Sequence, residues 1–310
     1  MTIGIQDISV YLPPSRQSNL SLLEQFDITE DFLVDKVGVT HRPVRGAHEN
    51  TSDMALIALE RLIEQSNIAR EKIQVLIVVT QNPDSRLPHV SGLLHGRAGL
   101  ARHCAAFDIS LGCSGYVYGL SIISSFMQSN GLSAGVLITC DPYSKIIDPN
   151  DKGTVLLFGD AATATLVSDS PNFVCTSFDF GSQGDLDKAL YEQDGLLHMD
   201  GRKVFNFAVQ SVPQSVSTLL DKAGLNISDI DAYLFHQGSR YIVEALAKRL
   251  KLDRARVRIS MASTGNTVSS SIPILLAEEI KNTTSSYLLL CGFGVGLSWA
   301  SCICQRLERY

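Results

Sequence analysis

The sequence predicts an α/β protein made of two related halves, and three observations carry that prediction. Helical and strand-like runs alternate along all 310 residues. Residues 72–81 (KIQVLIVVTQ) form a continuous apolar, β-branched run, which is typical of a strand covered on both faces. The order of runs in the first part of the chain recurs in the second. We therefore expect one half over 1–168 and another over 169–310, with largely internal sheets.

The first half contains an amphipathic helical run at residues 51–67, with Thr51 or Ser52 as the expected N-cap. The strand at 72–81 follows it. Residues 168–178 (SDSPNFVCTSF) and 189–197 (ALYEQDGLL) lack a comparable pattern. We expect these two stretches to form connecting or edge segments.

The second half repeats this order at low identity. Residues 205–226, 227–240, 241–252 and 257–280 correspond in turn to 51–67, 68–86, 90–100 and 105–128. Asp, Glu, Lys and Arg are absent from 109–140 and from 259–277, which predicts a buried helix in each half. These helices are expected to begin near Cys113 and Asn266.

Composition argues against several classes of protein. Hydrophobic residues make up 45% and charged residues 19%, as in water-soluble globular proteins. The net charge of −6 argues against general nucleic-acid binding, which needs a basic face. No apolar run is long enough to cross a bilayer, and residues 1–18 lack the pattern of a secretory signal. We expect a cytoplasmic protein that binds neither nucleic acid nor membrane.

Seven cysteines without a secretory signal favour reduced thiols over a disulfide framework. Cys302 and Cys304 fall on one face of a predicted strand, but no histidine lies at metal-ligand spacing from them, and we expect no metal site. Six cysteines are interpreted as small buried residues. These are Cys104, Cys140, Cys175, Cys291, Cys302 and Cys304.

Cys113 differs from the other cysteines in its position. It lies between Gly112 and Gly115, at the junction of a strand-like run and a helix-like run. Such a turn presents a side chain at the end of a sheet. The unpaired N–H groups of the helix that follows favour a thiolate. A catalytic nucleophile and a small buried residue are about equally compatible with this position.

His236 directly follows an apolar strand, and Asn266 occupies nearly the position of Cys113 in the repeat. A lone histidine is usually structural and an asparagine here is a common helix cap. The repeat nevertheless places Cys113, His236 and Asn266 at the carboxyl ends of equivalent strands, where α/β proteins form their sites. A glycine turn at 292–296 could add backbone N–H donors that form an oxyanion hole with Cys113.

With these residues identified, the chain resembles thiolase-fold condensing enzymes, most closely the β-ketoacyl-acyl-carrier-protein synthase III family. The resemblance extends from YLPP near the start to GFGVGLSWAS near the end, and is strongest in GCSGYVYGL, DPNDKGTVLLFGDAA, LFHQGSR and TGNTVSSSIP. It implies a thiolase-like fold with a five-layered α-β-α-β-α core. It also implies an acyltransferase of fatty acid biosynthesis and lipid metabolism.

The resemblance implies a role for each residue. Cys113 accepts an acyl group from a primer thioester. A malonyl thioester on acyl carrier protein then decarboxylates, and its enolate attacks the acyl-enzyme in a Claisen condensation. His236 and Asn266 donate hydrogen bonds to the malonyl thioester oxygen. The N–H groups of Cys113 and of the turn formed by Gly294, Val295 and Gly296 hold the tetrahedral oxyanion.

The substrate contacts depart from the family pattern. Phe32 stands in place of a tryptophan that stacks on coenzyme A, Lys36 and Lys152 replace arginines, and Ser239 replaces an asparagine that holds the pantetheine arm. Leu87 stands where an aromatic residue often lines the acyl end. Arg202 and Gly238 complete the expected coenzyme A and pantetheine contacts. The primer is therefore expected on coenzyme A or on a carrier protein, and no resident cofactor is expected.

Lys248 and Arg249 match a basic pair that the family uses to dock its acidic carrier protein. A solvated helix face is the simpler interpretation of this pair. The resemblance also implies a homodimer.

Alternative functions remain open at the level of sequence. The protein could transfer its acyl group to an oxygen or nitrogen nucleophile in a specialised pathway. It could also stabilise a partner in a hetero-oligomeric synthase, or be a cysteine hydrolase, whose Cys, His, Asn order it shares.

Overall fold

The computed structural model describes residues 2–282 and 284–307, and their architecture is built on one nine-stranded sheet. The strand order is β11-β12-β13-β8-β1-β7-β6-β4-β5. In this order the strands are Ala232–Phe235, Tyr287–Gly294, Ser298–Arg306, Phe173–Ser182, Gly4–Tyr11, Ala162–Ser168, Ala134–Cys140, Val75–Val79 and Ala105–Ile109.

The repeat predicted from the sequence is visible in the strand pairing. In one half β4 is parallel to β6, and β6, β7 and β1 continue antiparallel. In the other half β11 is parallel to β12, and β12, β13 and β8 continue antiparallel. In the first half β4 also pairs with β5 in parallel. At the corresponding place in the second half, the described residues form one parallel bridge, between Tyr233 and Val257. Strands β1 and β8 join the halves.

The division into domains at 168/169 falls in the connection between β7 and β8. That division stays a prediction, and the outermost residues of both ranges lie outside the described residues.

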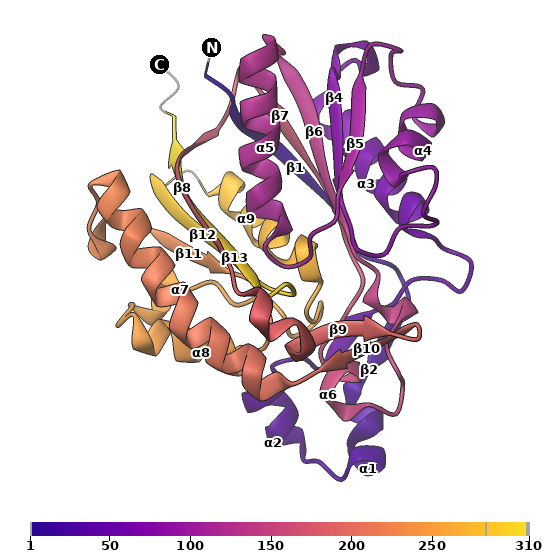
Figure 1. Cartoon of the computed structure of the whole chain (residues 1–310), viewed down its shortest axis with the longest axis vertical. Coiled ribbons are helices and arrows are strands. Elements are labelled where there is room, and N and C mark those ends of the chain that lie inside the picture. Colours follow the sequence, from indigo (N-terminus) through magenta and orange to yellow (C-terminus); the bar gives the residue numbers. More distant parts are fainter. Residues whose placement is uncertain (1, 283, 308–310) are drawn as a thin grey trace.

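Helices cover the sheet in layers, as Figure 1 shows. Helices α3 (Thr51–Ser66) and α4 (Val90–Arg97) pack on the outer face of the first half. Helices α5 (Gly115–Asn130) and α9 (Ser271–Lys281) lie between the halves, and α7 (Gly201–Ala223) with α8 (Arg240–Arg249) covers the outer face of the second. The predicted thiolase-like α-β-α-β-α order is therefore confirmed.

Strand burial explains this layering. Every residue of β4 is buried, because alternate side chains enter different cores. Ile77 packs towards the central helices, whereas Leu76 packs towards α3 and α4. On β11, Leu234 likewise packs in the core of the central helices, whereas Tyr233 packs in the outer core of the second half.

Three local predictions need correction. The N-cap of α3 is Asn50, which forms a capping box with Asp53, rather than Thr51 or Ser52. The stretch 168–178 leads into β8, a central strand paired with both β13 and β1, and not an edge. Helix α5 is buried along its first half, but Ile122 is 36% exposed. The absence of charged residues therefore did not predict correctly that the whole helix is buried.

The remaining elements are short and lie mainly near the ends of the central strands. The hairpin of β9 (Leu190–Gln193) and β10 (Leu196–Met199) fits the connecting role predicted for 189–197. The others are β2 (Arg16–Ser18), β3 (His41–Pro43), α1 (Leu23–Phe26), α2 (Glu30–Phe32) and α6 (Lys152–Val155). Among the described helices, none combines the length and apolar character needed to cross a membrane.

Candidate active site

Cys113, His236 and Asn266 line one cavity of about 350 Å³. Cys113 lies between β5 and α5, His236 directly follows β11, and Asn266 precedes the 3₁₀ turn Val268–Ser270 that leads into α9. The repeat predicted this convergence. Most other lining side chains are apolar and include Leu157, Phe158, Leu190, Met199, Val204, Phe205, Ile242 and Phe293.

Two glycines of β12 allow the strand to approach Cys113 closely. A Cβ at Gly294 would lie 2.7 Å from Cys113 Sγ, and one at Gly292 would lie 2.4 Å from the Cys113 carbonyl oxygen. Either contact is too short for a side chain to be tolerated without movement. The glycines therefore allow the backbone of β12 to pack against Cys113, whose exposed fraction is only 4%.

The pKa of the Cys113 thiol is raised to about 12, mainly by burial and further by the nearby Asp141 carboxylate. Hydrogen bonds from the backbone of Val295 and of Cys113 itself oppose this shift. The start of α5 was expected to favour a thiolate, but burial outweighs it. A reaction at Cys113 therefore begins from the thiol.

The glycine turn proposed for the oxyanion hole lies beside Cys113. Gly294 lines the cavity, and the backbone of Val295 reaches the sulfur. Gly296, with a φ of 138°, continues the turn between β12 and β13 in a conformation that suits glycine. Two backbone N–H groups, those of Val295 and of Cys113 itself, thus lie close to the sulfur.

His236 is buried and held in place from α9. Its Nδ1 lies 2.7 Å from Ser271 Oγ, and its ring packs edge-on against Phe293. Burial lowers the pKa of His236 to about 3, and a hydrogen bond with the Val268 backbone offsets this only in part. The imidazole is therefore neutral at physiological pH.

Asn266 is fixed by its own neighbours. Its Oδ1 accepts a 2.9 Å hydrogen bond from the N–H of Val268. Its backbone donates to the Leu157 carbonyl at 2.8 Å and accepts from the Gly159 N–H at 3.0 Å. With Oδ1 engaged, the amide nitrogen is the group left to donate to a ligand in the cavity.

Asp141, which sequence reasoning missed, links both halves of the site. This fully buried carboxylate follows β6 and accepts hydrogen bonds from the Gln81 N–H at 2.7 Å and from Ser269 Oγ at 2.5 Å. Gln81 in turn accepts a 3.1 Å bond from the Tyr143 hydroxyl. Burial raises the pKa of Asp141 to about 6, although these hydrogen bonds pull it down.

A second cavity, of about 740 Å³, adjoins the first, because both are lined by Leu157, Met199, Gly201, Ser239 and Tyr241. Phe32, Lys36 and Lys152 line the second cavity, while Arg202 and Gly238 line the first. The structure thus places all the residues predicted for coenzyme A and pantetheine along two adjoining cavities. Ser239 also caps α8 by accepting from the Ile242 N–H.

Two lysines of the second cavity lie over aromatic rings. The Nζ atom of Lys152 lies 5.3 Å from the centre of the Phe32 ring, and that of Lys36 lies 5.3 Å from the centre of the Tyr241 ring. Tyr241 stacks on Phe205 with 5.2 Å between ring centres. Tyr241 was missed at the sequence level, although it follows the LFHQGSR motif directly.

Lys248 and Arg249 lie at the opposite end of α8 from the cavities and are both exposed. The helix has ten residues, so about 14 Å separates its two ends. Within the described residues, neither side chain forms an ion pair with an acid. Arg249 lines a shallow groove together with Leu220 and Ile227.

Comparison with known proteins adds to this geometry. Residues 107–184 match the family model described as 3-oxoacyl-[acyl-carrier-protein (ACP)] synthase III, and residues 220–306 match that of its C-terminal part. The chain is 34% identical to β-ketoacyl-[acyl-carrier-protein] synthase III 1 of Bacillus anthracis, over 97% of this chain and 98% of that one. It is 33% identical to the synthase III of Lactococcus lactis, over 96% and 98%.

The fold agrees with these similarities. The crystal structure of 3-oxoacyl-(acyl-carrier protein) synthase from Burkholderia xenovorans superposes with a TM-score of 0.93 at 32% identity. The superposition covers 99% of this chain and 94% of that one.

Proposed function

The chain belongs to the β-ketoacyl-acyl-carrier-protein synthase III family and is an acyl-transferring condensing enzyme, and we propose that Cys113 is its acyl acceptor. Support comes from the convergence of Cys113, His236 and Asn266 on one largely apolar cavity. In the first step the sulfur attacks the carbonyl of a primer thioester. The leaving thiolate takes up the proton that Cys113 loses. Backbone donors of Cys113 and Val295 stabilise the tetrahedral oxyanion.

In the second step a malonyl thioester on acyl carrier protein occupies the cavity. Its carbon–carboxylate bond breaks, carbon dioxide leaves, and the electron pair forms an enolate whose oxygen accepts hydrogen bonds from His236 and Asn266. A neutral imidazole suits this role, because the oxygen needs donors and not a strong base. The enolate carbon then attacks the acyl group on Cys113, the bond between the acyl carbon and sulfur breaks, and the Cys113 thiolate that leaves takes a proton from solvent to restore the thiol.

Ser271 fixes the direction of the His236 donor in this proposal. When Ser271 Oγ donates to Nδ1, the neutral ring carries its proton on Nε2. Gly238 lines the cavity and lies beside the His236 ring, since a Cβ added to Gly238 would be 3.7 Å from His236 Nε2. In this proposal the substrate oxygen accepts the Nε2 proton in place of the Val268 backbone.

The primer thioester extends outward along the second cavity in this account. Phe32 and Tyr241 supply flat apolar surfaces, and Lys36 and Lys152 supply positive charge for phosphate groups. Lysine lacks the planar fork that lets arginine bind phosphate in two places. A phosphopantetheine arm of either coenzyme A or a carrier protein fits this chemistry, and neither needs a resident cofactor.

Lys248 and Arg249 form the docking pair for the carrier protein in the same proposal. Both are exposed, and the distance along α8 suits a carrier that rests outside while its arm reaches inward. Assembly as a homodimer and a cytoplasmic location complete the proposed picture. The dimer is proposed from the family resemblance, and Leu87, a large apolar side chain, is 86% exposed in the single chain.

Acyl transfer to an oxygen or nitrogen nucleophile is the second candidate, because the cavity does not by itself fix the acceptor. A purely stabilising subunit and a cysteine hydrolase receive less support, since the site keeps two donors suited to an enolate. Release of labelled carbon dioxide from a malonyl thioester separates these functions. We expect release by the unaltered chain and a loss of about 100-fold or more on Asn266→Ala. Acyl transfer without carbon dioxide release would favour the second candidate.

A further inference from the structure

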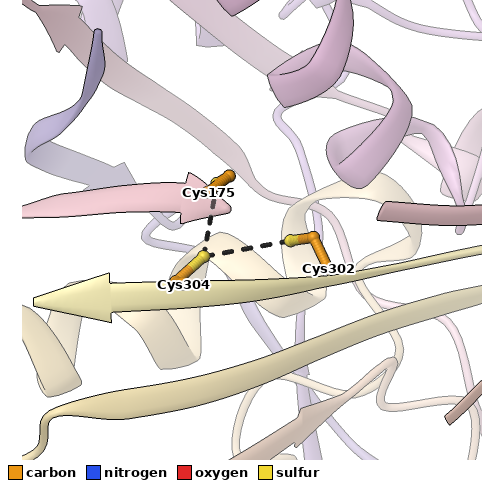
Figure 2. A group of neighbouring side chains, drawn as sticks. All are labelled: Cys175, Cys302 and Cys304. Carbon is orange, nitrogen blue, oxygen red and sulfur yellow. Dashed lines mark hydrogen bonds between the residues drawn. The ribbon is translucent and has the colours of Figure 1, made fainter. Parts of the chain in front are cut away.

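Three cysteines form a cluster away from Cys113. The sequence predicted that only two of them, Cys302 and Cys304, lie on the same face of a strand. Cys302 and Cys304 lie on the same face of β13, with their sulfurs 3.8 Å apart. Cys175 lies on β8 directly opposite Cys304, with 3.3 Å between the sulfurs. Figure 2 shows the three side chains converging. All three sulfurs lie within 4.8 Å of one another.

We propose that this thiol cluster is an oxidation site, in which Cys175 and Cys304 form a reversible disulfide while Cys302 stays reduced. The strand register selects this pair. Residues directly opposed on antiparallel strands have Cα atoms about 4.5–5.5 Å apart, inside the range of about 4.4–6.8 Å that disulfides require. Cys302 and Cys304 are two residues apart on one strand, which places their Cα atoms about 6.8 Å apart, at the limit of that range.

Burial determines which thiol reacts first. Cys302 and Cys304 are completely buried, whereas Cys175 as a whole residue keeps some exposure, although its sulfur lies deep among its neighbours. The hydrogen bonds from Cys302 and Cys304 also hold the pKa of Cys175 well below its ordinary value. A small oxidant is therefore expected to react with Cys175 first. The Cys304 thiol lies close enough to react with the oxidised Cys175 that forms.

Electrostatics favours a disulfide over a metal at this place. Burial and the neighbouring thiols shift the pKa values of the three thiols, and no described cation contributes. Three thiolates around a divalent metal would leave a net negative charge in the apolar layer between the halves. A disulfide carries no charge and suits that layer.

The oxidant in the proposed reaction is a hydroperoxide, with hydrogen peroxide as the simplest member. The Cys175 sulfur attacks one peroxide oxygen, the O–O bond breaks, and a sulfenic acid and water form. The Cys304 sulfur then attacks the sulfenic sulfur, the S–S bond forms, the S–O bond breaks, and a second water leaves. Two thiols thus lose two electrons and two protons in total, and a dithiol reductant restores them.

The test uses the Cys113→Ala chain, so that the proposed nucleophile cannot contribute. The protein is exposed to hydrogen peroxide, denatured with iodoacetamide and digested for mass spectrometry. We expect a linked peptide pair containing Cys175 and Cys304, with the mass lowered by two hydrogens and with Cys302 alkylated. Dithiothreitol should restore alkylation of both. Alkylation of all the cysteines, or a link between Cys302 and Cys304, would overturn the proposal.

Two further variants keep the test independent of folding defects. Cys302→Ser should still form the linked pair. Cys304→Ser should instead accumulate a sulfenic acid on Cys175, which dimedone traps. A Cys175 that resists dimedone in the folded Cys304→Ser chain, or stoichiometric zinc that stays bound and blocks oxidation of the parent, would count against an oxidation site.

Discussion

Ser269 Oγ donates a 2.5 Å hydrogen bond to Asp141 Oδ2, joining residues that are 128 positions apart. Asp141 also accepts a hydrogen bond from the N–H of Gln81. The side chain of Gln81 packs closely against Gly112, since a Cβ added to Gly112 would lie 2.5 Å from its Oε1 atom. Ser269 lies three residues after Asn266. A single buried carboxylate is therefore bonded to the turn that carries Asn266 and to Gln81, whose side chain packs against the turn that carries Cys113.

Asp141 gives the folded protein a specific pH dependence. Burial raises its pKa from 3.8 to about 6, so between about pH 4 and 6 the folded state binds more protons than the unfolded state. The free energy of unfolding should therefore fall as pH rises through that window. Asp141→Asn removes this contribution, amounting to about 1–1.5 kcal/mol between pH 5 and pH 7.5.

Urea unfolding of both proteins at the two pH values measures this contribution. The difference in stability between variant and parent should become more favourable to the variant at the higher pH. An equal difference at pH 5 and pH 7.5 would show that Asp141 does not titrate in this way.

Ser271→Ala should impair the decarboxylation step more than the acylation step. Without the contact to Nδ1, the His236 proton can reside on either nitrogen, and the donor to the enolate oxygen is lost part of the time. We expect carbon dioxide release to fall about 10-fold, within the range found when one donor is weakened. The rate at which Cys113 gains an acyl group, followed by intact mass, should change little. A parallel fall in both rates would indicate a general structural defect.

Gly294→Ala tests the close approach of β12 to the nucleophile. The new Cβ would lie 2.7 Å from Cys113 Sγ, so either the strand or the cysteine must move. We expect a loss of about 1–3 kcal/mol in the free energy of unfolding and much slower acylation of Cys113. Gly184→Ala is the control, because its Cβ would meet no described atom within 4 Å. Equal effects of the two substitutions would refute the packing argument.

Reversing the charges of Lys248 and Arg249 should weaken docking of the acidic carrier protein. We expect the KM for malonyl-carrier protein to rise about 10-fold, with a weaker dependence on salt, while kcat stays close to that of the parent. Charge reversal of exposed Lys72 and Arg102, on other elements, is the matched control. An unchanged KM in the Lys248/Arg249 variant would place the docking surface elsewhere.

The sequence predicted the relationships that follow from its repeat. The shared cavity of Cys113, His236 and Asn266 could be foreseen because equivalent strand ends meet in duplicated α/β halves. The thiol cluster could not be foreseen, because Cys175 meets Cys304 only through the pairing of β8 with β13, which includes a bulge between Ile303 and Cys304. No local pattern encodes that register.

Burial was the other quantity that the sequence did not supply. The start of α5 favours a thiolate at Cys113, but the extent of desolvation is set by the surrounding strands and outweighs it. Asp141 was missed for the same reason, since a single acid after an apolar strand carries no sign of its partners. Tyr241 required knowledge of how α8 faces the cavities.

Intact-mass measurement after exposure to a panel of acyl-coenzyme A and acyl-carrier-protein thioesters tests the central assignment most directly. We predict that the chain gains the mass of one acyl group, that the adduct maps to Cys113, and that Cys113→Ala gains none. An acyl adduct that persists in the Cys113→Ala chain, or one that maps to another residue, would contradict the account.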